Sequence, residues 1–207
     1  MIRRLRRAVC TLLLLAVLPG AAARAEAIEA AWAGISWGDS SDALMRHFGA
    51  RATALPRAID FGDSYVDVVL RRVVIGGYEL IAFYQMDKAG GGLKRIQFER
   101  QRHGVGPAVF RAVVAALAAT YGPPDIVCGT GATPESGYQS ASEISWRRSD
   151  GTIRAIFRDT TIEAFEGCLA GDPSLGPCGL TGQILVRISP PDSDAGRCLA
   201  PRPATAR

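Results

Sequence analysis

Residues Gly106–Pro124 read GPAVFRAVVAALAATYGPP, which predicts a single amphipathic helix with both ends marked. Pro107 suits the first helical position, where its missing N–H costs nothing. Gly122 favours a left-handed residue after the helix, and Pro123 prevents its continuation. Spacings of three and four residues place five large side chains on one face: Phe110, Val113, Val114, Leu117 and Tyr121. This face must be buried, so we expect the neighbouring strands to pack against it.

The chain before this helix predicts a second helix and a three-stranded meander. Residues 37–49 (WGDSSDALMRHFG) read as a short helix that ends at a glycine. Residues 50–63 contain Pro56 and read as irregular. From Tyr65 the hydrophobic period changes to two, and Gly76-Gly77 is a typical two-residue hairpin turn. The expected strands are 65–75, 78–86 and 93–101.

The chain after the helix predicts a loop and further antiparallel strands. Residues 129–142 are rich in Gly, Ser, Thr and Pro and read as a loop. Residues 144–160 form a hairpin pattern with Asp150-Gly151 at its turn, and residues 182–189 read as the last strand. Strands grouped around two helices predict an α+β fold, with an antiparallel β-sheet and both helices packed on one face.

The first 25 residues have the features of a secretory signal peptide. A basic start (Arg3, Arg4, Arg6, Arg7) precedes an apolar run, Ala8–Leu18, that is too short to span a membrane as a helix. Small residues favour cleavage after Ala25, with cleavage after Ala23 as the alternative. We therefore expect a periplasmic or secreted protein with no membrane span in the mature chain.

Removal of this segment changes the charge balance. The whole chain has 24 Lys+Arg and 20 Asp+Glu, a net charge of +4. Five of the arginines and none of the acids lie in residues 1–25, so the mature chain is close to neutral. A phosphate-binding protein needs a clustered basic excess, so no nucleic-acid partner is expected.

Four of the cysteines follow the signal peptide, which predicts two disulfides with three possible connectivities. The favoured pairs are Cys168–Cys178, which closes a short loop, and Cys128–Cys198, which ties the Pro-rich tail to the exit of the main helix. A zinc site is the alternative, but the close Cys-x-x-Cys spacing is absent. The sequence therefore predicts a disulfide-stabilised domain without a metal or another cofactor.

The domain organisation allows two descriptions. Residues 26–198 form either a single α+β domain or two similar modules, at about 35–100 and 105–190, followed by a mobile tail over 199–207. The second description rests on a helix ending in glycine that precedes strands twice, as ALMRHFG and as LAATYGPP.

A helix ending in FG or YGxP, followed by an antiparallel hairpin with Trp146, resembles the small α/β modules of the β-lactamase-inhibitor and outer-membrane-assembly lipoprotein group. The similarity covers residues 107–158 and, more weakly, 35–86. The chain departs from the group in lacking a lipobox cysteine and in having longer loops. The resemblance implies protein–protein binding across the sheet face without catalysis, and it transfers no individual binding residue.

Catalytic motifs are absent from the sequence. The two histidines, His47 and His103, are read as a helix-end cation and a solvated residue, and no G-x-S-x-G, S-x-x-K, H-E-x-x-H or Walker pattern occurs. Two acidic sets are left as candidates for a paired-carboxylate hydrolase. They are Asp60, Asp63 and Asp67, and Asp159, Glu163 and Glu166.

Arginine and aromatic residues on the predicted strands are the other candidates. If they share the sheet face opposite the helices, that face has a composition typical of protein interfaces. The candidate binding residues are Trp146, Arg148, Arg154, Arg158, Arg71 and Tyr78, with Arg72 and Arg147 nearby. We therefore predict a non-enzymatic binding or interaction module with an envelope protein as partner. A small secreted hydrolase that uses Asp159, Glu163 and one acid of residues 60–67 is the alternative. The sequence does not indicate an oligomeric state.

Overall fold

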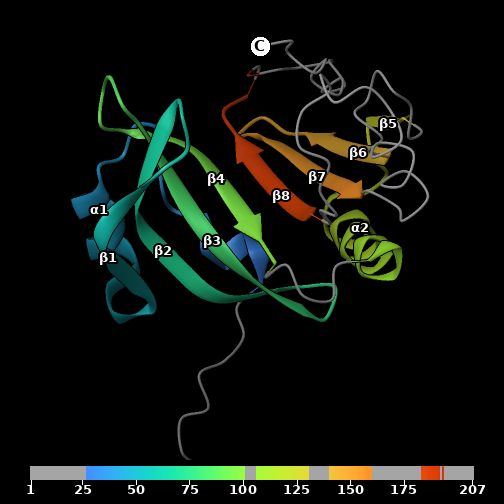
Figure 1. Cartoon of the computed structure of the whole chain (residues 1–207), viewed down its shortest axis with the longest axis horizontal. Coiled ribbons are helices and arrows are strands. Elements are labelled where there is room, and N and C mark those ends of the chain that lie inside the picture. The colour runs from blue at the N-terminus through green and yellow to red at the C-terminus, as the bar shows by residue number, and fades with distance from the viewer. Residues whose placement is uncertain (1–26, 101–105, 131–139, 160–182, 192, 194–207) are drawn as a thin grey trace, which may run out of the picture.

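The computed structural model describes residues 27–100, 106–130, 140–159, 183–191 and 193. These residues form an antiparallel sheet with the strand order β1-β2-β3-β4-β8-β7-β6-β5 (Figure 1). The strands are β1 Ala52–Asp60, β2 Ser64–Ile75, β3 Tyr78–Asp87, β4 Leu93–Glu99, β5 Ile126–Thr130, β6 Ser140–Arg147, β7 Thr152–Asp159 and β8 Gln183–Ser189. The helices are the short 3₁₀ turns η1 Ile28–Ala31 and η2 Gly49–Arg51, and the α-helices α1 Ser41–Phe48 and α2 Pro107–Tyr121.

The element order is the same in the two halves of the chain. Helix α1 precedes β1 to β4, and helix α2 precedes β5 to β8. Within each half the strands pair in sequence, except that β8 also pairs with β4. The last strands of the two halves therefore meet at the centre, and β1 and β5 form the two edges of one sheet (Figure 1).

The central helix forms as its sequence predicts. Helix α2 begins at Pro107 after Gly106, and Gly122 ends it with a φ of 83°, a value that glycine adopts without strain. Phe110 stacks on Phe157 of β7 with ring centroids 5.4 Å apart. The β2–β3 turn lies so close to α2 that a Cβ on Gly76 would come within 2.4 Å of the Ala112 carbonyl oxygen. Helix α2 therefore contacts both halves of the sheet.

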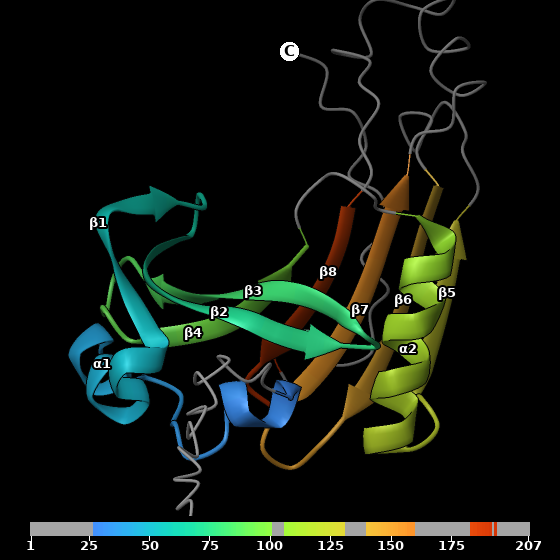
Figure 2. The same ribbon diagram turned by 90° about the horizontal axis from the view of Figure 1, so that it is seen from below.

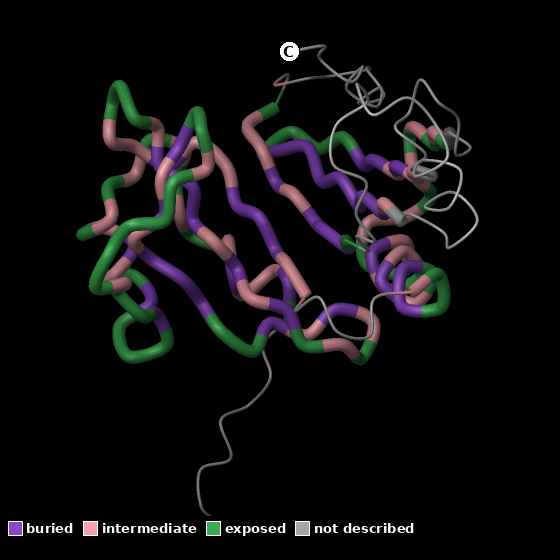
Figure 3. The backbone as a smooth tube through the Cα atoms, in the orientation of Figure 1, coloured by how far each residue is buried: buried purple, intermediate pink, exposed green. Residues whose placement is uncertain are grey.

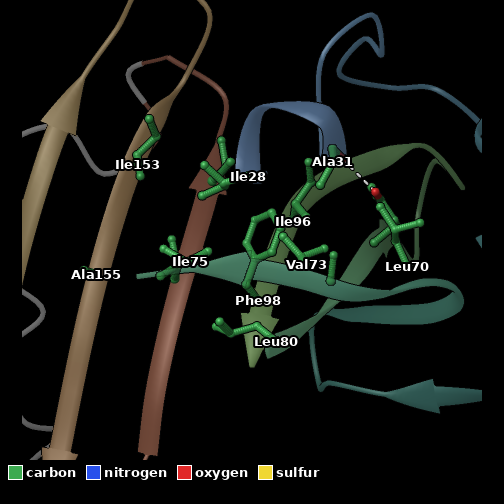
Figure 4. Close-up of a cluster of buried hydrophobic side chains, with 14 of the residues drawn as sticks. Ile28, Ala31, Leu70, Val73, Ile75, Leu80, Ile96, Phe98, Ile153 and Ala155 are labelled. Atoms are coloured by element: carbon green, nitrogen blue, oxygen red, sulfur yellow. Dashed lines mark hydrogen bonds between the residues drawn. The ribbon is translucent and has the colours of Figure 1, made fainter. Parts of the chain in front are cut away.

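One hydrophobic core lies between the sheet and the helices. It joins residues of η1, α1 and α2 to one face of the sheet, so both α-helices cover the same face (Figure 2). Figure 4 shows Ile28 and Ala31 of η1 beside core residues of the strands. Tyr84 crosses this core and donates a hydrogen bond of 2.7 Å from its hydroxyl to the Ala31 carbonyl oxygen. Buried and partly buried residues make up most of the central strands, while the outer turns and most of β1 are exposed (Figure 3).

The prediction of a disulfide-stabilised α+β fold is wrong. Two short α-helices accompany an eight-stranded antiparallel sheet, so the described part of the chain is mostly β. Residues 50–63, read as irregular, contain β1, and residues 129–142 include the end of β5 and the start of β6. The other predicted strands, both helices and the Gly76-Gly77 turn are confirmed.

Edge position explains the missed strand at residues 52–60. Strand β1 pairs on one side only, its register shifts between Ala54 and Ile59, and most of its side chains are exposed. Pro56 lies within the shifted region, where no ladder hydrogen bond is required of it. An exposed edge strand needs no alternation of apolar and polar residues, so the pattern on which strand prediction depends is absent.

The predicted disulfides do not hold the described framework together. Cys168, Cys178 and Cys198 lie outside the described residues. Cys128 on β5 is disulfide-bonded, but its partner also lies outside them, so no disulfide joins two described elements. Both expected pairs, Cys168–Cys178 and Cys128–Cys198, include residues outside the described ones, and backbone pairing and core packing connect the described strands.

The two ends of the chain, residues 1–26 and 194–207, also lie outside the described residues, and with them the expected signal peptide and tail. Within the described ranges, no helix has the length and apolarity needed to cross a membrane.

Candidate binding face

The sheet has a second face, opposite η1, α1 and α2. Side chains alternate along a strand, so residues between the core members Ile96 and Phe98 of β4, or Ile153 and Ala155 of β7, point away from the helices. We call this surface the open face because none of η1, α1 and α2 covers it, although many of its side chains, Gln85, Gln97 and Arg154 among them, are buried. It comprises Val69, Ile81, Phe83, Gln85, Arg95, Gln97, Glu99, Glu143, Ser145, Arg154, Ile156, Arg158, Leu185 and Arg187.

The register of the strands brings polar residues into one row across the open face. Gln97 of β4 lies opposite Arg187 of β8, Arg187 lies opposite Arg154 of β7, and Arg154 lies opposite Ser145 of β6. Directly opposite residues on neighbouring antiparallel strands have Cβ atoms about 5 Å apart. The row therefore crosses the boundary between the two halves of the chain and places two arginines side by side.

Arg154 is held by a buried ion pair. Its Nε lies 2.7 Å from Oε1 of Glu143, and the two side chains are only 5% and 7% exposed. A buried charge is costly unless it is paired, so each member of this pair depends on the other. The pair fixes the position of Arg154 beneath the middle of the open face.

Arg95 forms a second network at the β3–β4 side. Its Nη1 donates to Oδ2 of Asp63 over 2.9 Å, its Nη2 contacts the other carboxylate oxygen, and its Nε donates to Gln85. The Arg95 guanidinium and, to a smaller extent, the ammonium of Lys94 hold the pKa of the Asp63 carboxyl well below its usual range. Asp63 is therefore ionised throughout the physiological pH range.

Arg187 lies between these two networks and has a different partner. Its Nε and Nη2 both donate to Oε1 of Gln97, over 3.2 and 2.7 Å, and the amide nitrogen of Gln97 donates to Glu99. Burial, and then the charges of Arg95 and the arginines of β7, lower the pKa of Arg187. Arg187 thus lies in a positive environment and is hydrogen-bonded to a neutral amide.

Apolar side chains flank this polar row. Val69, Ile156 and Leu185 are almost fully buried although they are not members of the core cluster under the helices. Phe83 is partly buried, and its ring lies 6.1 Å from that of Phe61. The open face therefore combines several arginines with Phe83, and arginine and aromatic residues are both enriched at protein interfaces.

The structure brings together two of the six candidate binding residues, Arg154 and Arg158. Trp146 instead points to the helix side, where it is 1% exposed and donates from Nε1 to the Gly122 carbonyl oxygen over 2.8 Å. Trp146 lies opposite Ile153 in the ladder, and Arg154 is the next residue along β7, so Trp146 and Arg154 point to opposite faces of the sheet. The register between β6 and β7 decides this, and the pattern within one strand does not give the register.

Of the remaining three candidates, Arg148 and Arg71 line two separate clefts, and Tyr78 contacts Arg100 of the second. The second cleft is also lined by Ile81 and Glu99 of the open face. Arg148, in the β6–β7 turn, stacks over the ring of Tyr121 at 5.4 Å and lines a cleft of about 490 Å³ with Trp32 and Trp37. Arg71 is exposed and lines a cleft of about 470 Å³ with its neighbour Arg72. Tyr78, which is partly buried, carries the guanidinium of Arg100 4.7 Å from its ring centroid. Arg147, named beside the candidates, is exposed and follows Trp146 on β6, so alternation places it on the same side of the sheet as Ser145.

The acidic candidates are held by neighbouring residues. Asp60 pairs with Lys88 at 2.7 Å, Asp63 pairs with Arg95, and both carboxylate oxygens of Asp67 accept from the Ser41 hydroxyl at 2.8 Å. Glu163 and Glu166 lie outside the described residues, as does the side chain of Asp159. The three described acids are therefore bound to other groups rather than presented together.

The histidine candidates do not join a site within the described residues. His47 is exposed in the last turn of α1 and packs edge-on against Phe48, with ring centroids 4.7 Å apart. His103 lies outside the described residues. No group of three or more His, Cys, Asp or Glu side chains in the described ranges is placed to hold a metal ion.

Sequence reasoning missed Arg187, Arg95 and Gln97. The sequence GQILVRIS does contain a signal for Arg187, because this residue is the single charge in an apolar strand. Alternation places its side chain on the face opposite to Val186 and Ile188. The pairing of β8 with both β4 and β7 was not predicted, and only this pairing places Arg187 beside Gln97 and Arg154.

The chain was compared with protein-family models, with curated proteins and with solved structures. No family model, no curated protein and no solved structure matches it. The function must therefore be argued from the residues of the open face.

Proposed function

We propose that this chain is a non-enzymatic binding module that binds a protein partner through the open face after export to the periplasm or the exterior. The observation that supports it most is the one-sided arrangement of the fold. Helices η1, α1 and α2 pack on one face of the sheet, and the opposite face carries arginines in both halves together with Gln85, Gln97 and Phe83 in the first. This side-chain composition is enriched at protein interfaces.

The rigidity of the sheet also favours recognition. Backbone hydrogen bonds join the central strands on both sides, and a continuous core supports them from behind. A rigid surface loses little conformational entropy on binding, so more of the interaction energy appears as affinity. The small α/β modules to which the sequence shows a resemblance imply the same use of a sheet face.

Site-specific photo-crosslinking tests this proposal. A photoreactive benzoylphenylalanine at position 83 replaces a partly buried phenylalanine of the open face with a similar ring. The matched control carries it at position 111, an exposed site on the outer surface of α2. In cells of the native host, we expect a discrete protein adduct from position 83 and none from position 111. Equal adducts from the two positions, or adducts from position 111 alone, would refute the proposal.

A further inference from the structure

A cleft on the helix side of the sheet lies apart from the open face and has no part in the proposed function. Its volume of about 490 Å³ is within the usual range of small-molecule sites. Both halves of the chain line it. Residues 29–37 of the first half lie beside residues 148–150 in the β6–β7 turn, and Tyr121 at the end of α2 completes the wall (Figure 2). Ligand sites often occur where two structural units meet in this way.

Aromatic side chains form much of the cleft wall. Trp32, Trp37 and Tyr121 all line the cleft, and each is partly rather than fully buried. The second half of the chain holds the two tryptophans in place. Trp32 Cζ3 lies 3.3 Å from where a Cβ on Gly151 would be, and Trp37 donates from Nε1 to the Asp150 carbonyl oxygen over 2.9 Å. The rings are therefore fixed at the cleft before any ligand arrives.

One of these rings already accepts a cation. The Arg148 guanidinium lies 5.4 Å from the centroid of the Tyr121 ring. Aromatic faces attract cations, and tryptophan does so most strongly. Within the part of the chain that the structure describes, no cation lies over the ring of Trp32 or Trp37. The two rings best suited to bind a cation are therefore left for a ligand.

Acidic side chains accompany the rings. Glu29 and Asp150 line the cleft, and the Asp39 carboxylate accepts a hydrogen bond of 2.7 Å from the amide of the lining residue Ser36. Glu29 also contributes, after burial, to the raised pKa of Tyr121, so its carboxylate lies close to this ring. The ion pairs of the described residues include none to Glu29.

The nearby basic side chains do not offset these acids. Arg147, Arg148 and Lys94 are the basic residues in the lining or next to it in sequence. Arg148 lies 3.8 Å from a carboxylate oxygen of Asp150, and Lys94 lies 3.1 Å from Asp63. Alternation along β6 points Arg147 to the other side of the sheet. The cleft therefore keeps a surplus of negative charge, which attracts a cation and repels an anion.

We propose that this cleft binds a small organic cation through a quaternary ammonium group, which lies against Trp32 and Trp37 with the Glu29 carboxylate as its counter-charge. A quaternary ammonium has no N–H donors, so aromatic faces and a nearby acid suit it better than a ring of hydrogen-bond acceptors. A metal ion does not fit, because no group of three or more His, Cys, Asp or Glu side chains in the described ranges is placed to hold one.

A titration with choline tests the inference, and the uncharged carbon isostere 3,3-dimethylbutanol is the control for shape. Heteronuclear NMR of the mature protein follows the indole N–H signals. Trp146, which is buried and donates to the Gly122 carbonyl oxygen, is the internal reference. We expect choline to shift the Trp32 and Trp37 signals with a Kd of about 1 mM, and the isostere to bind about fivefold more weakly or not at all.

Two substitutions separate the contribution of the ring from that of the charge. Trp32→Leu should weaken choline binding about fivefold or more, whereas Phe83→Leu, which removes a partly buried ring of the open face, should have less than about a twofold effect. Trp32 also packs against the core, so Glu29→Gln is a second variant that keeps the shape of the cleft. It should weaken choline binding about twofold to fivefold, and the exposed control Glu79→Gln should not.

Three results would overturn the inference. They are the absence of shifts at Trp32 and Trp37 with choline at about 20 mM, equal affinities for choline and its isostere, and equal effects of Glu29→Gln and Glu79→Gln. Vesicles of phosphatidylcholine carry the same ammonium group and distinguish its source. If choline binds, cosedimentation with the vesicles assigns the site to a lipid head group, and its absence assigns the site to a soluble molecule. Crosslinking from position 83 tests the open face separately, so failure of either proposal leaves the other standing.

Discussion

Gly76 provides a direct test of how the two halves of the molecule contact each other. It lies in the β2–β3 turn of the first half and packs against helix α2 of the second. A Cβ at this position would come within 2.4 Å of the Ala112 carbonyl oxygen and 2.8 Å of the Val113 amide nitrogen. Both are backbone atoms of a helix, so Gly76→Ala cannot be accommodated by a side-chain rotation.

The expected loss of stability has two parts. Gly76 has a φ of 62°, and alanine in this left-handed region costs about 1 kcal/mol. The displacement of the turn from α2 adds about 1–3 kcal/mol, the usual cost of overpacking. Gly77→Ala is the matched control, because Gly77 has a φ of 81° but no atom within 4 Å of its virtual Cβ. Gly77→Ala should therefore show only the cost of placing alanine in the left-handed region.

Urea unfolding of the two variants, followed by circular dichroism at one pH, measures this difference. We expect Gly76→Ala to be less stable than Gly77→Ala by about 1–3 kcal/mol. Equal losses in the two variants would show that the turn does not contact α2 in solution. The reasoning about a shared helix would then be wrong.

Three further predictions concern single side chains. Trp146→Phe should lower the free energy of unfolding, measured in urea, by about 2–4 kcal/mol, because the Gly122 carbonyl oxygen loses its hydrogen-bond donor and a cavity forms. A decrease below about 0.5 kcal/mol would contradict this. The pKa of Asp63 lies below its ordinary 3.8, so the ionised carboxylate contributes to the stability of the fold above about pH 4, and this contribution is lost as the pH falls further. Asp63→Asn should therefore be less stable than the wild type at about pH 7, with a smaller difference in stability at about pH 2.5. A difference that does not change with pH would refute the argument. Burial and, secondly, Glu29 raise the pKa of Tyr121 above its ordinary 10.0, so the neutral hydroxyl contributes to the stability of the fold below about pH 10, and this contribution is lost above it. Between about pH 9 and 11, Tyr121→Phe should therefore lose less stability than the wild type. Parallel curves of stability against pH for the two proteins would contradict this.

Much of the fold follows from local patterns in the sequence. Pro107 and Gly122 mark the ends of α2, and two adjacent glycines mark the β2–β3 turn. These signals work because they depend on backbone conformation and hydrogen bonding within a few residues. The edge strand β1 carries no such pattern because its side chains are exposed, so the fold was predicted as α+β when it is mostly β.

The candidate site was less accessible to prediction. Arg154 and Arg158 were recognised from their strand, but the partners Glu143, Gln97 and Arg187 come from other strands. A strand pattern gives the alternation of side chains within that strand and carries no information about which strands become neighbours. The pairing of β4 with β8, which creates the polar row, is a long-range contact set by the whole fold.

The pairing of β4 with β8 is also the basis of the account, because it joins the two halves into one sheet with one open face. Nuclear Overhauser effects between backbone protons measure it directly. We predict strong cross-strand contacts between Ile96 and Ile188 and between Phe98 and Val186. Contacts within each half, such as Ala82 with Phe98, are the internal control. Presence of the control contacts without those between β4 and β8 would contradict a continuous sheet and, with it, the proposed binding face.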